Sequence, residues 1–147
     1  MTNILSMFPN YPTQEEIMNS PVKHKKETLK AVKGWRQLVW KEVKNGNPRE
    51  KFDGLARLIN IISMVYNKPC IVIFEPDGQI GCRYNPVTKT IVIDRSLSIV
   101  STLHELAHHL FGENEKIACR WSIWLFKKVW PKAFAKLRWE GHLLKRQ

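Results

Sequence analysis

The sequence predicts an α+β fold in which helices precede and follow a small sheet. Apolar positions recur at helical spacing over residues 22–66, short β-branched runs separated by turns occupy residues 70–94, and helical spacing returns from residue 97. Because helices and strands are segregated along the chain, the α+β class is favoured over an alternating parallel α/β fold. We expect N-terminal helices, a small three-stranded mainly antiparallel sheet, and then a helix with functional residues followed by further helices.

Length and composition suit one domain. The 147 residues are 44% hydrophobic, which is enough to build a core without staples. We expect a flexible arm over residues 1–19 and a single domain over residues 20–147. The three cysteines form no CxxC pair, so neither a disulfide framework nor a zinc ribbon is expected. With no signal peptide and no long apolar run, we expect a cytoplasmic protein that does not enter a membrane.

Two helices are predicted before the sheet. Ser20-Pro21 suits a helix start, and the stretch 22–44 keeps helical spacing until Asn45-Gly46 breaks it. Asn47 then caps a second helix, with Glu50 three residues later as in a capping box. This second helix is expected to run almost to the first strand.

Three short strands are predicted in the middle of the chain. Residues 70–74, 80–84 and 90–94 are rich in β-branched and apolar side chains, and turn residues separate them. Short connections make an antiparallel meander the default arrangement. We also expect one of these strands to be a sheet edge beside the functional site, where an extended polypeptide can pair with it.

Helical spacing after the sheet predicts three more helices. The first covers residues 97–111 and ends at Gly112, since glycine is common just after a helix. The second covers about residues 115–130. Pro131 then opens a short basic helix that we expect to end near Trp139.

The first of these helices carries the pattern HExxH. His104 and His108 lie one helical turn apart on one face, so both imidazoles can bind one zinc ion at about 2.0–2.1 Å. Glu105 projects about 100° round the helix, where it can reach a water held by the metal and act as general base. Zinc lowers the pKa of such a water to about 7. The pattern therefore predicts a hydrolytic Zn²⁺ site.

The surroundings of the motif strengthen this interpretation. The helix is apolar over most of its surface, which is typical of a largely buried helix. His104 and His108 would then be buried polar groups, which are costly unless they are satisfied. A metal ion satisfies them. The alternative is a pair of core histidines bonded to the backbone with Glu105 at the surface, and it leaves spacing and burial as coincidence.

The third ligand has to come from another segment. Glu115 is the best candidate, because at the start of the next helix it shares a stripe with Ala118, Cys119 and other small or apolar residues. Glu113, in the turn, is the nearest substitute. The alternative for Glu115 is an ordinary N-terminal charge favoured by the helix dipole.

The stretch TLHELAHHLFGENEKIACRWS resembles the ImmA/IrrE-type metallopeptidases, which pair an HELxH helix with a later ExxANxFA-like helix. Glu115 and Ala118 match the second element, whereas Cys119 stands where asparagine is common. The resemblance implies a zincin-like, gluzincin-type fold with zinc on His104, His108 and Glu115. It also implies cleavage of a specific protein, often a DNA-bound repressor of phage, mobile-element or stress genes, as suits a chain encoded by such elements.

Two other families of zinc enzymes share part of this motif. A SprT-like protease acting on DNA-bound protein suits the net charge of +11, but its third ligand is normally histidine and only His142 follows the motif. A peptide deformylase would use Cys82, yet Ala107 stands where its motif has aspartate. For the transition state, Tyr84, His109 and Arg120 are candidates that no spacing argument separates.

A basic nucleic-acid-associated module with a structural metal site is the rival from a different class. The basic faces of residues 23–44 and of the segment 127–146 would contact phosphates, although plain solvation also explains such faces. Glu105 discriminates between the two readings, because a structural site does not need a general base beside an open coordination position.

Overall fold

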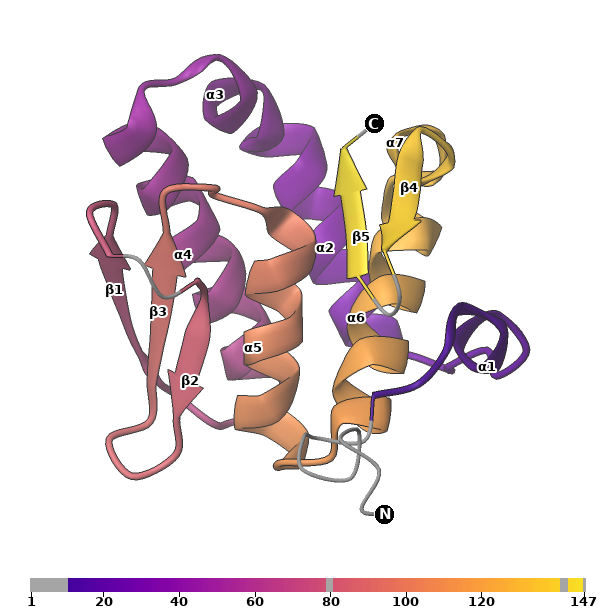
Figure 1. The fold of residues 1–147 in the computed structure, drawn as a ribbon. Helices are drawn as coiled ribbons and strands as arrows, with labels where there is room; N and C mark the ends of the chain where they lie inside the picture. Colours follow the sequence, from indigo (N-terminus) through magenta and orange to yellow (C-terminus); the bar gives the residue numbers. More distant parts are fainter. Residues whose placement is uncertain (1–10, 79–80, 141–142, 147) are drawn as a thin grey trace.

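The computed structural model describes residues 11–78, 81–140 and 143–146, and it has the predicted α+β class (Figure 1). The elements run in the order α1 Gln14–Met18, α2 Lys26–Leu38, α3 Trp40–Asn45, α4 Pro48–Val65, β1 Ile71–Glu75, β2 Arg83–Asn85, β3 Thr90–Asp94, α5 Ile99–Phe111, α6 Glu115–Val129, α7 Pro131–Ala135, β4 Leu137–Glu140 and β5 Leu143–Arg146. Helices therefore flank a small sheet in the chain, as the sequence predicts.

The helix predicted over residues 22–44 is divided into α2 and α3. α2 begins at Lys26 because the segment before it is extended and buries His24 against α6. Beyond Val39 the chain turns, and α3 packs back on α4. Gly54 of α4 permits this contact, since a Cβ there would collide with Val43. Packing between distant segments thus sets where α2 begins and where it gives way to α3.

α4 begins as predicted. Asn47 Oδ1 accepts a hydrogen bond from the Glu50 backbone N–H at 2.9 Å, and Glu50 Oε1 accepts one from the Asn47 N–H at 3.1 Å. The capping box is therefore complete. The side chains on its buried stripe are fully inaccessible at Leu55, Leu58, Ile59 and Ile62.

The sheet is mixed, and the predicted antiparallel meander is wrong. Its order is β1-β3-β2, with β3 parallel to β1 and antiparallel to β2. β3 is the central strand, and its Ile91, Val92 and Ile93 are all buried because neighbouring strands and side chains surround it. Arg83 Nη2 lies 2.9 Å from Glu75 Oε2, and this ion pair joins the two edge strands across the face that holds Val92.

Two elements near the chain ends differ from the sequence prediction. α1 lies within the expected flexible arm, and its Ile17 is fully buried against Cys119 and Ile123 of α6. The first ten residues of that arm lie outside the described residues. At the other end α7 stops at Ala135, and β4 and β5 pair as an antiparallel hairpin where the helix was expected to reach Trp139.

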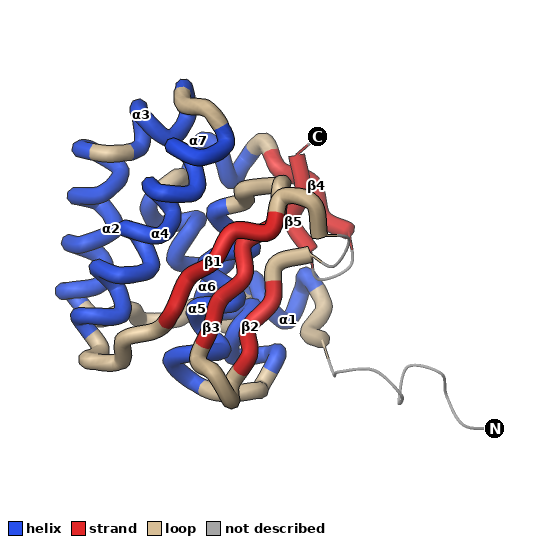
Figure 2. Tube along the Cα trace, turned by 90° about the vertical axis from the view of Figure 1, so that its left-hand side faces the viewer, coloured by secondary structure: helices blue, strands red, loops and turns tan. Residues whose placement is uncertain are grey.

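α4 and α5 cover one face of the sheet and leave the other face open (Figure 2). On the covered face Phe52 of α4 stacks on Phe74 of β1, with ring centroids 5.1 Å apart. On the open face Ile71 and Ile73 remain exposed. α5 contacts α4, α6, β2 and β3, so it is the central helix of the fold. Among the described residues, no helix combines the length and the apolar surface that crossing a bilayer requires.

His24 ties the segment before α2 to α6. It is 5% exposed, its Nε2 donates to the Trp121 carbonyl at 2.9 Å, and its Nδ1 accepts from Lys128 Nζ at 2.9 Å. The two bonds need a neutral imidazole, because Nδ1 must keep its lone pair to accept from lysine. Burial and then the charge of Lys128 lower the pKa of His24 to about 4, although the bond to Trp121 opposes the shift.

We expect His24 to weaken the fold on acidification. Its pKa is about 4 in the folded protein and about 6.5 in an unfolded chain, so only the unfolded chain binds a proton in that interval. The free energy of unfolding should fall by about 3 kcal/mol from pH 6.5 to pH 4 through this residue. His24→Gln keeps a donor and an acceptor but cannot titrate, so its urea denaturation should depend less on pH. Equal pH dependence in both proteins would contradict this role.

Candidate metal centre

Short caps fix the ends of the two helices that build the site. Ser98 Oγ accepts from the Ser101 N–H at 3.1 Å and starts α5. Gly112 ends α5 with a φ of 102°, in the left-handed region that favours glycine. Asn114 then caps α6 through its side-chain oxygen. The turn between the two helices is therefore short, and the first residues of α6 lie beside the last turn of α5.

The apolar side of α5 sets its rotation about its own axis. The main core buries three leucines of this helix, Leu103, Leu106 and Leu110. Because residues three and four apart share a helix face, this burial turns the remaining face, with His104 and His108, toward α6. The HExxH residues are therefore presented to the neighbouring helix.

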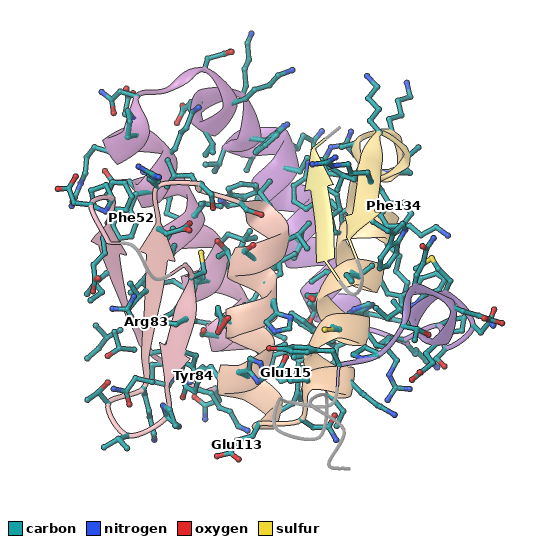
Figure 3. All side chains as sticks on the ribbon, in the orientation of Figure 1. Phe52, Arg83, Tyr84, Glu113, Glu115 and Phe134 are labelled. Carbon is teal, nitrogen blue, oxygen red and sulfur yellow. The ribbon has the colours of Figure 1, made fainter. Side chains whose placement is uncertain are left out.

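Three donor groups converge between α5 and the first turn of α6 (Figure 3). Glu115 Oε2 lies 3.0 Å from His104 Nε2, and Glu115 Oε1 lies 2.9 Å from His108 Nε2. The two Nε2 atoms are 3.2 Å apart. The side chains are mostly buried, with exposures of 20% for His104, 11% for His108 and 16% for Glu115. The structure thus brings together the three residues that the sequence predicts as ligands.

Glu113, the substitute for Glu115, does not reach this cluster. It is exposed in the turn and points away from the two helices, whereas Glu115 lies between them (Figure 3). The backbone turns between these two residues because Asn114 caps the new helix. The Asn114 cap therefore decides that Glu115, and not Glu113, faces the two histidines.

Hydrogen bonding leaves room for a cation at the centre of the cluster. His108 Nδ1 lies 2.9 Å from the Gly112 carbonyl, which can only accept, so Nδ1 carries the proton. In a neutral ring the lone pair is then on Nε2, where it faces the Glu115 carboxylate at 2.9 Å. Two acceptors at that distance repel each other unless a positive charge lies between them. Either a proton or a metal ion meets this need.

The distances fit a zinc ion. Donors bound tetrahedrally at about 2.0–2.1 Å lie about 3.4 Å from one another. Here the two imidazole nitrogens lie 3.2 Å apart, and each lies 2.9–3.0 Å from one of the two Glu115 carboxylate oxygens. Outward movements of a few tenths of an ångström are sufficient to admit the ion. The Gly112 carbonyl would hold the His108 ring in place, as partners behind metal-binding histidines commonly do.

Cys119 is a further sulfur donor near the cluster. His104, Glu115 and Cys119 each offer a ligand atom, and these atoms lie within 4.8 Å of one another. The Cys119 Sγ contacts Nδ1 of His104 at 3.8 Å, on the far side of the ring from Nε2. The set of two histidines and Glu115 is tighter, and we therefore take it as the primary ligand set, with Cys119 behind His104.

The electrostatics of the cluster favour a positive charge. Burial raises the pKa of Glu115, but hydrogen bonds from His104 and His108 outweigh burial and lower it to about 2. Burial lowers the pKa of His108, but the bonds to Glu115 and to the Gly112 carbonyl outweigh it and raise the pKa. Burial and the nearby carboxylates raise the pKa of Cys119 to about 12, so without a metal this thiol is neutral.

Glu105 lies beside the cluster at the wall of a cavity. The cavity has a volume of about 650 Å³, and His104 and Cys119 also line it. Burial raises the pKa of Glu105, and the charges of the two ligand histidines oppose the shift. A second hollow of about 560 Å³ lies between α1 and α6 and contains none of these residues. The larger cavity is therefore the one relevant to chemistry.

The segment that leads into the edge strand β2 lines part of this cavity. β2 is an edge strand that packs on α5, and Gly81 and Cys82 just before it line the cavity. This placement agrees with the expectation that one strand is an edge beside the functional site. An extended polypeptide can add to such an edge through backbone hydrogen bonds.

The three candidates for transition-state stabilisation lie elsewhere. Tyr84 Oη bonds His109 Nδ1 at 2.8 Å, and His109 Nε2 donates to the Lys68 carbonyl at 2.7 Å, so both side chains brace α5. Arg120 lines the other hollow. Tyr11 lines the cavity beside Glu105 instead, and the sequence gives no signal for it because it falls in the expected arm.

Comparisons with family models, with curated proteins and with solved structures found no match.

Zinc binding should depend on Glu115 and not on Glu113. Glu115→Ala removes the group that faces both imidazoles, so we expect at least a tenfold loss of zinc affinity, as for the loss of other groups that organise a metal site. Glu113→Ala is the matched control and should bind zinc like the wild type. Competition with a chromophoric chelator measures both affinities. A loss in Glu113→Ala alone would transfer the ligand role to Glu113.

Proposed function

We propose that this protein is a zinc-dependent endopeptidase that cleaves a specific intracellular protein. The main support is the convergence of His104, His108 and Glu115 with Glu105 beside them in an accessible cavity. Three protein ligands leave one tetrahedral position for water or substrate, as in catalytic zinc sites. A carboxylate next to that position supplies a general base, which a purely structural site does not need.

The proposed reaction gives each residue a defined task. Zinc bound by these three ligands would polarise a substrate carbonyl and lower the pKa of a water molecule. Glu105 takes a proton from the attacking water as the new C–O bond forms. It then delivers a proton to the amide nitrogen as the C–N bond breaks. Gly112 keeps the His108 ring oriented through its carbonyl.

A protein substrate is proposed because the cavity adjoins the edge of β2. Strand addition there would present an extended backbone next to Glu105. The resemblance of the HELAHH and EKIACRWS segments to the ImmA/IrrE-type metallopeptidases suggests a DNA-bound repressor as that protein. A SprT-like protease remains a second assignment within the same reaction class.

A structural metal site is the alternative that one observation favours. Cys119 lies close enough to His104 and Glu115 to suggest a four-ligand site closed by a thiolate. A closed site has no position for water, and the protein would then be a binding module whose basic faces contact nucleic acid.

Glu105→Gln should separate the base from the ligands. The amide cannot take a proton, so we expect proteolysis of a peptide library to fall by at least about 10²-fold. Zinc content should stay at that of the wild type, because Glu105 is not a ligand. Mass spectrometry of the peptides and elemental analysis of the protein give the two readings. Full activity in Glu105→Gln would rule out the mechanism.

Cys119→Ser tests the structural alternative. With Cys119 behind the ligand ring, we expect this variant to keep zinc affinity within a few-fold and to keep proteolysis. The cobalt-substituted wild type should lack the strong sulfur-to-metal absorption of a thiolate ligand. A sulfur band that disappears in Cys119→Ser would support the closed site instead.

A further inference from the structure

We infer that the catalytic cavity selects polypeptides by a bulky apolar side chain, bound between α6, α7 and β4. The inference rests on the proposed function, because it assigns specificity to the same site. The residues that line the cavity are of two kinds, an apolar group along α6, α7 and β4 and a polar group between β3 and α5.

One wall is apolar and leads away from the ligands. It is formed along α6 by Ile123 and Phe126 and continues through Trp130, Ala133 and Leu137. Ile123, Phe126 and Trp130 are fixed in the core, with exposures of 3%, 6% and 4%. Rigid apolar side chains at the wall of a cavity form a site for an apolar group of matching shape.

The segment from the end of β3 into α5 supplies polar groups to the lining. These are Asp94, Ser96, Ser98, Ser101 and Glu105, and the apolar Leu97, Ile99 and Val100 lie among them in the chain. Gly81 and Cys82, just before the edge strand β2, lie on the same cavity. A polypeptide backbone needs hydrogen-bonding partners, which these polar groups and the strand edge provide. The backbone of a substrate therefore fits the polar side, and its side chain fits the apolar side.

Charge excludes nucleic acid from the cavity. The chain contains 24 lysines and arginines against 13 acidic residues, yet none of the described residues that line the cavity is a lysine or an arginine. The charged groups there are Asp94, Glu105 and the site histidine His104. A polyanion would be repelled by this lining. The described lining therefore favours a neutral group over a phosphate at this point.

The volume suits a large side chain. The cavity measures about 650 Å³, within the range of pockets that enclose compact organic ligands. It reaches from His104 to Leu137, so it extends beyond the reacting groups. A leucine, methionine or phenylalanine side chain near the scissile bond would fill the apolar part, whereas alanine would leave it empty.

The preference is measured by binding and by cleavage. A peptide library digested by the zinc-supplemented wild type identifies a cleaved sequence, and pairs of this peptide differ only by leucine or alanine near the scissile bond. Binding is measured separately with the Glu105→Gln variant, so that it does not depend on finding cleavage. Two labelled library peptides that differ only by leucine or alanine at one position are titrated with this variant. We expect the leucine peptide to be favoured by at least about tenfold in binding or in kcat/KM.

Two alanines of α7 give a matched pair of variants. Ala133 lines the cavity, whereas Ala135 is exposed and does not. Ala133→Trp should fill the apolar part and remove the preference for leucine at least tenfold, and Ala135→Trp should change nothing. Should Ala133→Trp fail to fold, Leu137→Ala enlarges the same part and should shift the preference from leucine to phenylalanine.

The outcomes separate the two proposals. Binding of apolar peptides without any cleavage would keep the inference and overturn the peptidase. Cleavage without an apolar preference, or a preference unchanged by both Ala133→Trp and Leu137→Ala, would overturn the inference alone. Neither binding nor cleavage would overturn both.

Discussion

Two imidazole nitrogens and a carboxylate held within 3.2 Å of one another require a positive charge among them. That requirement connects the parts of this structure. The Gly112 carbonyl fixes the proton of His108 on Nδ1 and so directs its lone pair at Glu115. The short turn and the Asn114 cap put Glu115 at the start of α6, opposite both histidines. An apolar substitution of one ligand would leave the others as buried polar groups without their partner.

α5 satisfies several demands at once. Its leucines fill the core, His104 and His108 face α6, and Glu105 faces the cavity. His109 adds a brace, because it bonds both Tyr84 of β2 and the Lys68 carbonyl. The sheet also holds α5 in position. It fixes the end of α5 that carries His108, and the segment before its edge strand β2 lines the cavity.

Charge is distributed unevenly between the surface and the cavity. The protein carries a formal net charge of +11, but the cavity beside the ligands has acidic and neutral walls. Basic residues of α3 and α7 lie at the same end of the fold in both views (Figures 1 and 2). Attraction of an acidic partner and selection of a peptide segment would therefore use different parts of the molecule.

Features that depend only on residues close together in the chain could be predicted from the sequence. Helical periodicity, the capping box of Asn47 and Glu50, and the placement of HExxH on one helix all follow from spacings of three or four residues, which local backbone geometry controls. The tertiary structure decided what depends on contacts between distant segments. Strand order, the division of α2 from α3 and the anchoring of α1 through Ile17 are of this kind. The same holds for the choice of Glu115 over Glu113 as the partner of both histidines, because that choice depends on how α6 is placed against α5.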